Sequence, residues 1–106
     1  AVHDASKRAG ESAWPMPFPE ELRANLDSSV ADIMNIPLVG RPHGGMMTGG
    51  IFLADFIKDG QRWAHLDIAG PSYNAGGPHG YTPKGGTGSA VRTLVQLAED
   101  LADGAV

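Results

Sequence analysis

Residues 63–70 are Trp63-Ala64-His65-Leu66-Asp67-Ile68-Ala69-Gly70. Small or aliphatic side chains occupy positions 64, 66 and 68, and tryptophan, histidine and aspartate occupy the positions before and between them. Successive side chains of a β-strand point to opposite faces, so this alternation is typical of a strand with one buried face. Turn-forming residues flank the segment, with Gly60 before it and Pro71 after it. The sequence therefore predicts a strand over 63–70.

A helical pattern precedes this predicted strand. Apolar residues recur at helical spacing over residues 46–57, which predicts a buried helix that ends before Asp59-Gly60. Gly49 and Gly50 inside it each cost about 1 kcal/mol relative to alanine. We therefore expect them to allow the close approach of another element.

A second helical pattern closes the sequence. Residues 89–102 carry an apolar stripe at i, i+3, i+4 and i+7 opposite polar residues, which predicts an amphipathic helix. Thr87 or Ser89 is placed to cap its start, and Gly104 is placed to end it.

The first third of the chain predicts short helices separated by prolines. Residues 1–12 form a weakly apolar helical pattern, and the alternate prolines of residues 14–19 favour an extended connector. Pro19 and the two glutamates after it begin a second helix, which we expect to end between Asp27 and Ser29. Residues 31–36 suit either helix or strand, and residues 37–45 read as a loop.

Glycines dominate the long connection over residues 71–88. Connections of more than about 12 to 15 residues inside a compact domain are usually functional, partly disordered or packed by neighbours. A glycine loop that opens a helix also suggests a phosphate-binding module, but Lys84 precedes two glycines and no G-x-G-x-x-G follows the strand. A loop whose glycines permit tight turns is favoured over a phosphate-binding loop. Stabilisation of the folded chain by anions would be the evidence for phosphate binding.

Composition narrows the class of protein. The 106 residues carry a net charge of −4 and contain no cysteine, which suits one small domain or a piece of a larger one, without disulfides or thiolate zinc sites. The negative charge argues against nucleic acid as a partner, and no apolar run has the roughly 20 residues that a membrane helix needs. We expect a cytoplasmic protein.

Candidate catalytic groups are sparse. His65 and Asp67 would share one face of the predicted strand, where a metal or a base with its orienting carboxylate would be possible. Structural hydrogen bonds are the favoured interpretation of this pair, because a metal needs three or four ligands and His43 and His79 show no ligand spacing. Ser72 follows the strand but lacks the G-x-S-x-G context of a hydrolase nucleophile.

Four blocks occur in order along the chain. They are Gly10-Glu11 with Trp14 and Pro17; Ala31-Asp32 with Asn35-Ile36; Gly44-Gly45 with Thr48 and Phe52-Leu53; and residues 63–70 followed by Lys84-Gly85-Gly86-Thr87-Gly88 and Val91-Arg92-Thr93-Leu94. Together they resemble the C-terminal end of the leucyl (cytosol) aminopeptidase family, and they cover most of the chain.

The resemblance implies an α/β fold. Residues 1–106 would be an incomplete domain, the C-terminal segment of a three-layer α/β/α catalytic domain with helices and at least one sheet strand. The family removes N-terminal amino acids, leucine among those preferred, from peptide substrates. It uses two divalent metal ions, zinc or manganese, that activate a bridging water. The resemblance further implies a cytoplasmic homohexamer that needs the remainder of the aminopeptidase chain.

The family's metal-binding motifs, a K-G-x-x-x-D block and an N-T-D-A-E-G-R block, are absent from this sequence. No catalytic or metal-ligating residue therefore carries over, and the segment alone is expected to be inactive. The resemblance does assign substrate-binding positions. Ala69 would line the pocket for the substrate's N-terminal side chain, Ser72 would form the next wall position, and Ile36 would touch the side chain of the leaving residue. The alternative is a separate noncatalytic fragment that folds against a partner.

Overall fold

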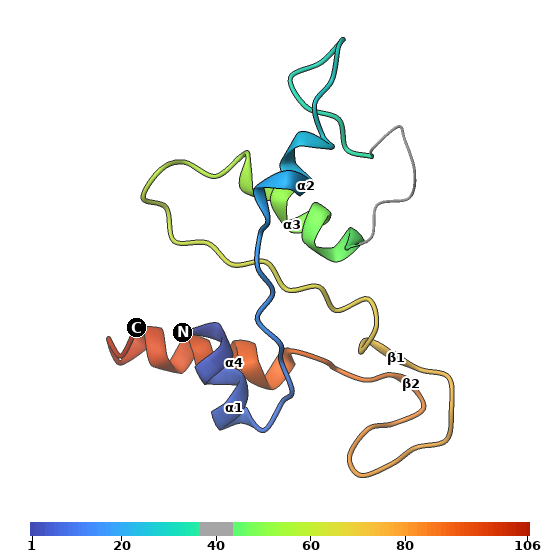
Figure 1. Cartoon of the computed structure of the whole chain (residues 1–106). Helices are drawn as coiled ribbons and strands as arrows, with labels where there is room; N and C mark the ends of the chain where they lie inside the picture. Colours follow the sequence, from blue (N-terminus) through green and yellow to red (C-terminus); the bar gives the residue numbers. More distant parts are fainter. Residues whose placement is uncertain (37–43) are drawn as a thin grey trace. The chain divides into compact units, whose positions relative to one another are not determined.

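The computed structural model describes residues 1–36 and 44–106, which form two compact units. The terminal unit comprises residues 1–15 and 66–106, and the central unit comprises residues 16–65. The elements in chain order are α1 (Val2–Ala9), α2 (Glu20–Ala24), α3 (Gly45–Ala54), β1 (Tyr73–Asn74), β2 (Gly85–Gly86) and α4 (Val91–Ala102) (Figure 1). Most of the loop expected over residues 37–45 lies outside the described residues.

The terminal unit is built around α1 and α4, which lie against each other (Figure 1). Ala5 and Ser6 of α1 are buried, and their small side chains allow the two helices to approach closely. Asp100 of α4 is also buried, and its carboxylate accepts hydrogen bonds from Arg8 of α1 and from Gln96. A charged pair therefore links α1 and α4.

The helices of the terminal unit end in the same backbone motif. Gly10 follows α1 with φ at 69°, in the left-handed region that favours glycine. The N–H groups of Gly10 and Glu11 donate to the carbonyls of Lys7 and Ser6 at 3.2 and 2.9 Å, which satisfies the last carbonyls of the helix. Gly104 repeats this arrangement after α4, with φ at 68°. The helix end predicted at Gly104 is confirmed.

Replacing Gly10 with alanine is expected to lower the free energy of unfolding by about 1 kcal/mol, because alanine adopts positive φ at a cost. An added Cβ at Gly10 meets no atom within 4 Å, so this cost is conformational and not steric. Gly49→Ala is the matched control. Gly49 lies inside α3 with open space around it and is expected to gain about 0.5–1 kcal/mol. Urea denaturation measures both variants, and a Gly10→Ala chain as stable as the parent would contradict the prediction.

The central unit is formed by α2 and α3, which lie beside each other (Figure 1). Its core contains Leu26, which is completely buried, and Ile51 of α3. Arg23 of α2 pairs with Asp27 at 2.9 Å and with Asp55, directly after α3, at 2.7 Å. The hydrogen bond to Asp55 raises the pKa of Arg23 above its usual value, although partial desolvation opposes it. The ion pair between Arg23 and Asp55 therefore links the end of α3 to α2.

Aromatic side chains surround Gly50 in the central unit. The rings of Phe18 and Trp63 are 5.9 Å apart, and His65 stacks on Trp63 at 6.3 Å. A Cβ at Gly50 would lie 2.8 Å from the ring of Phe18, so only glycine lets that ring approach α3. The close approach expected at Gly50 is confirmed, whereas the same expectation for Gly49 is wrong. The extended connector predicted for residues 14–19 is also confirmed.

Two helices of the central unit are shorter than their sequence patterns predict. α2 ends at Ala24 instead of between Asp27 and Ser29, and α3 ends at Ala54 instead of Ile57. After each helix the chain continues in tight turns with hydrogen bonds between residues three apart. Such turns keep the helical spacing of apolar residues without extending the helix. Residues 31–36 form neither helix nor strand.

The strand predicted over 63–70 is wrong for the described structure. Residues 61–68 have no regular secondary structure, and Ala69 and Gly70 lie in a turn. The alternation of apolar and polar residues determines which side chains would lie on each face of a strand. A strand also needs a neighbouring strand with which its backbone N–H and C=O groups form hydrogen bonds. Within residues 1–36 and 44–106, the backbone of residues 63–67 bonds to no other segment. The segment instead crosses from the central unit to the terminal unit after His65.

The sheet lies where the sequence indicates a loop. β1 and β2 pair antiparallel, with Tyr73 opposite Gly86 and Asn74 opposite Gly85. The connection over residues 71–88 is therefore a β-hairpin with a long excursion. Two of its glycines, Gly85 and Gly86, lie in the strand pairing instead of forming a row of free amides, which argues against the phosphate-binding module.

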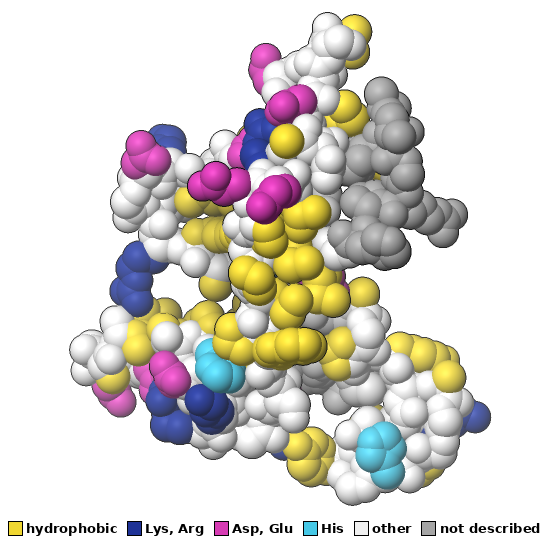
Figure 2. Space-filling view, viewed as in Figure 1, with side chains coloured by type: hydrophobic (Ala, Val, Ile, Leu, Met, Phe, Trp, Pro, Cys, Tyr) yellow, Lys and Arg dark blue, Asp and Glu magenta, His cyan; other side chains and the backbone are white. Residues whose placement is uncertain are grey.

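Large apolar side chains remain at the surface of both units (Figure 2). On α4 they include Val91, Leu94 and Leu101, which belong to the stripe that predicts an amphipathic helix. On α3 they include Met46 and Leu53, so the helix expected to be buried is only partly covered. Among the described helices, none is long and apolar enough to cross a membrane.

Candidate functional site

Ala69 and Ser72 lie in one tight turn of the terminal unit. The Ala69 N–H donates to Asp67 Oδ1 at 3.0 Å, and the Ser72 N–H donates to the Ile68 carbonyl at 2.9 Å. The Ser72 hydroxyl donates back to the Ala69 carbonyl at 3.3 Å. The structural interpretation of Asp67 is therefore confirmed, because its carboxylate shapes this turn. Of the three predicted substrate-binding residues, the structure brings these two together.

Thr87 holds this turn from the opposite limb of the hairpin. Its N–H donates to the Ser72 carbonyl at 3.0 Å, and its hydroxyl donates to the Pro71 carbonyl at 2.5 Å. Ser72 stands opposite Thr87 in the register that β1 and β2 establish. We call this pair of hydrogen bonds the Thr87 clamp, and it fixes the turn relative to the residues that lead into α4.

The excursion between β1 and β2 is held together by its own polar groups. The Asn74 amide donates to the carbonyls of Gly77 and Pro83 at 3.0 and 3.1 Å. At the tip, the backbones of His79 and Thr82 exchange hydrogen bonds at 3.1 and 2.8 Å. The hairpin therefore has a defined conformation with little apolar core.

A network of Tyr81, Arg92 and Glu11 joins the hairpin to both helices of the terminal unit. The Tyr81 hydroxyl donates to the Gly10 carbonyl at 3.1 Å, and the Arg92 guanidinium donates to the Tyr81 oxygen at 2.6 Å. The same guanidinium lies 4.1 Å from the centre of the Tyr81 ring and 3.8 Å from the Glu11 carboxylate. Arg92 therefore makes structural contacts with Tyr81 and Glu11.

Glu11 caps the start of α4. Its Oε2 accepts hydrogen bonds from the N–H and the hydroxyl of Thr93 at 2.8 and 2.6 Å. The prediction of Thr87 or Ser89 as the cap is wrong, because the helix starts after Ala90, which occupies the N-cap position with a left-handed backbone at φ 68°. A carboxylate from a residue 82 positions earlier fulfils that function.

Neighbouring charge and burial change the pKa of Glu11 in opposite directions. Desolvation raises its pKa, but the hydrogen bonds from Thr93 and the positive charge of Arg92 together outweigh it, so the pKa lies below its usual value. The hydrogen bond to Tyr81 raises the pKa of Arg92, against partial desolvation. Both groups are therefore ionised at neutral pH and serve structural contacts.

A cavity of about 370 Å³ lies between the hairpin and the start of α4. Its wall includes Pro71 and Thr87, which come from the two limbs of the hairpin. Glu11, His79 and Arg92 also line it. This wall is largely polar, and the clamp is one of its parts. Among the residues that the structure describes, the turn is therefore backed on this side by open space and not by packed apolar side chains.

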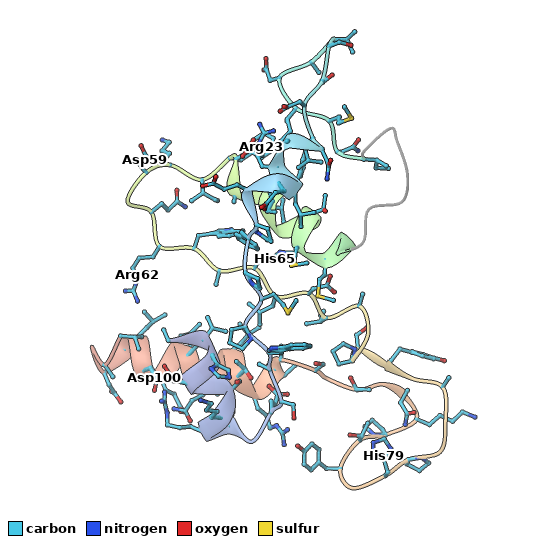
Figure 3. All side chains as sticks on the ribbon, viewed as in Figure 1. Arg23, Asp59, Arg62, His65, His79 and Asp100 are labelled. Carbon is cyan, nitrogen blue, oxygen red and sulfur yellow. The ribbon has the colours of Figure 1, made fainter. Side chains whose placement is uncertain are left out.

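No metal centre forms among the residues that the structure describes. No group of three or more histidine, aspartate or glutamate side chains there is placed to bind an ion. His65 stacks on Trp63 in the central unit, and His79 lies at the end of the hairpin in the terminal unit (Figure 3). His43 lies outside the described residues. Ile36 is 70% exposed and belongs to the central unit.

Sequence reasoning missed the contributions of Glu11, Tyr81 and Thr87. Glu11 lies two residues beyond the end of α1 and 82 positions before Thr93, so its carboxylate gave no local signal of a contact with α4. The position of Thr87 in the sequence predicts a cap for α4, but its hydroxyl instead contacts the turn before β1.

Comparisons with known proteins match this chain almost throughout. The model of the cytosol aminopeptidase family, catalytic domain, matches residues 1–95. A probable cytosol aminopeptidase of Streptomyces coelicolor is 59% identical over 104 residues, and one of Nocardia farcinica is 54% identical over 99 residues. These alignments cover 98% and 92% of this chain but 20% and 19% of the relatives. The chain thus spans about a fifth of the length of the curated relatives that it matches.

Solved structures agree with these sequence matches. The bottromycin maturation enzyme BotP aligns with a TM-score of 0.88 and 46% identity, over 96% of this chain and 22% of BotP. A structure of BotP in complex with Mn aligns with a TM-score of 0.87 and 46% identity, over 95% of this chain and 22% of that one. The α/β fold class that the resemblance implied is confirmed. Since the catalytic-domain model accounts for all but the last residues, the chain belongs to the cytosol aminopeptidase family.

Proposed function

We propose that this chain is the C-terminal part of the catalytic domain of a metal-dependent aminopeptidase that releases N-terminal residues, leucine-like ones preferred, from peptides. The match of the family's catalytic-domain model to residues 1–95 is the observation that carries this proposal. The whole enzyme would include the remainder of the aminopeptidase chain, and we propose a cytoplasmic homohexamer as its working form.

Within that enzyme the Ala69–Ser72 turn forms a wall of the pocket for the substrate's N-terminal side chain. A methyl group at Ala69 leaves room for a branched aliphatic side chain, and burial of such a side chain favours binding. The Ser72 hydroxyl is already bonded to the turn, which limits how strongly it makes the wall polar. Ile36 is proposed to contact the leaving residue, because its side chain is largely exposed in this chain.

The metal ions bind outside the described residues in this proposal. The described side chains do not gather into a donor set, so they do not fit a metal site by themselves. Two divalent ions, zinc or manganese, would be held by the remainder of the enzyme. The relative BotP, which has been observed in complex with Mn, supports manganese as the first ion to test.

A noncatalytic segment that folds against a partner is the second candidate. The exposed apolar side chains of α3 and α4 favour it, because surfaces of this kind are normally covered. Here the partner would be a separate polypeptide and not the remainder of the same chain.

Hydrolysis of leucine p-nitroanilide tests the proposal. We expect turnover from the complete aminopeptidase chain with Mn²⁺ or Zn²⁺, loss of turnover with a chelator, and no turnover from residues 1–106 alone. Metal-dependent turnover by residues 1–106 would contradict the assignment of the ligands to the remainder of the chain. A complete chain that stays inactive with either ion would favour the noncatalytic segment.

A further inference from the structure

We propose that Thr87 is a positioning residue that sets the side-chain preference of the substrate pocket by holding the Ala69–Ser72 turn. This inference rests on the proposed function, because it takes the turn as a pocket wall. Thr87 itself need not touch the substrate. It acts through Pro71 and Ser72, whose carbonyls it holds from the other limb of the hairpin.

The geometry of the clamp supports this role. One residue supplies both bonds, from its N–H to Ser72 at 3.0 Å and from its hydroxyl to Pro71 at 2.5 Å. Two bonds to adjacent carbonyls restrict rotation of the turn as well as its distance from β2. The hydroxyl bond is the one that a side-chain substitution removes directly, because every replacement except proline keeps the N–H group that makes the backbone bond.

Packing gives the turn little support on the side of the clamp. The open cavity of about 370 Å³ includes Pro71 and Thr87 in its wall, so no side chain of the described residues fills the space beside them. A turn backed by packed apolar groups would keep its position when one hydrogen bond is lost. Here the position depends on the clamp, and its loss is expected to shift the wall.

A shift of the pocket wall is expected to change the binding of the substrate more than the rate of the chemical step. The reacting bond and the metal ions lie elsewhere in the proposed enzyme, so the pocket wall acts on both ground state and transition state. Loss of such uniform binding raises KM and leaves kcat nearly unchanged. A general loss of folding would instead lower the amount of active enzyme and with it the apparent kcat.

The test compares threonine variants in the complete enzyme. Thr87→Val removes the hydroxyl and keeps the shape, and we expect KM for leucine p-nitroanilide to rise about three- to tenfold with kcat within about twofold. The preference for leucine over alanine p-nitroanilide is expected to narrow. Thr87→Ser retains the hydroxyl and is expected to restore the parental KM. Thr82→Val is the matched control on the same hairpin, because the backbone of Thr82, and not its hydroxyl, bonds to His79.

A second readout uses residues 1–106. Amide exchange at Thr87 reports the bond to Ser72 directly, and we expect it to accelerate in Thr87→Val but not in Thr82→Val. Thr87→Cys, whose thiol is a weak donor, replaces Thr87→Val if the latter fails to fold in the enzyme, and its KM is expected to be intermediate.

The outcomes separate the inference from the function on which it rests. An inactive parent enzyme would contradict the proposed function. An active parent with unchanged KM and selectivity in Thr87→Val would overturn the positioning role, as would an equal change in Thr82→Val. A raised KM with rescue by Thr87→Ser would support it.

Discussion

Replacing Ala69 with phenylalanine in the complete enzyme is expected to lower kcat/KM for leucine p-nitroanilide by about 100-fold, which corresponds to about 2.7 kcal/mol. The proposed pocket accepts a leucine side chain because position 69 contributes only a methyl group. A benzyl group there would occupy the volume that the substrate side chain needs. The loss for glycine p-nitroanilide is expected to be much smaller, since glycine places no side chain in that volume.

Ala75→Phe is the matched control for this experiment. It introduces the same ring in the same unit, at an exposed position on the hairpin and outside the turn. Its kinetics are expected to match those of the parent enzyme for both substrates. Equal losses for leucine and glycine in Ala69→Phe would instead indicate damage to the fold, and parental kinetics would remove Ala69 from the pocket wall.

Replacing Glu11 with alanine is expected to lower the free energy of unfolding of residues 1–106 by about 2 kcal/mol. The Glu11 side chain is 12% exposed, and its removal leaves the Thr93 N–H and the Arg92 guanidinium without their carboxylate. Glu11→Gln keeps an acceptor oxygen but removes the charge, so its free energy of unfolding is expected to fall by about half as much as that of Glu11→Ala. Glu99→Ala on the exposed side of α4 is the control and should change stability by less than about 0.5 kcal/mol.

Acid provides an independent test of Glu11. Because its pKa in the folded chain lies below the ordinary value of 4.5, its contribution is present above about pH 4.5 and is lost as the pH falls through the folded value. The stability difference between the parent and Glu11→Gln should therefore shrink below pH 4.5. Urea denaturation from pH 7 to pH 3 measures it, and a difference that stays constant across this range would contradict the ionised cap.

The helices were predictable because their signals are local. Spacing of apolar residues located α3 and α4, and Gly104 marked the end of α4, since a helix end needs only its own neighbours. Residues 63–70 show the limit of this reasoning. Their alternation describes two faces, but pairing requires a second segment, and the described residues supply none.

The candidate site rests on resemblance and not on a pattern in the residues. Ala69 and Ser72 stand in no catalytic pattern of their own, and periodicity relates neither of them to Thr87. The cap of α4 illustrates the same limit, because Glu11 and Thr93 are 82 residues apart and meet only after α1 and α4 pack. Contacts of this kind depend on the tertiary arrangement, so local propensities do not reveal them.

The pairing of Ser72 with Thr87 makes the rest of the hairpin a natural place for changes in chain length. The pair closes the loop at its base, while the Asn74 bonds and the His79–Thr82 tip are internal to the excursion. Doubling the length of a flexible loop costs only about 0.6 kcal/mol in closure entropy. Insertions between residues 75 and 78, which leave Tyr81 on Gly10 and Arg92, should thus be tolerated while the turn keeps its place, which makes this part of the hairpin suited to carrying a foreign peptide.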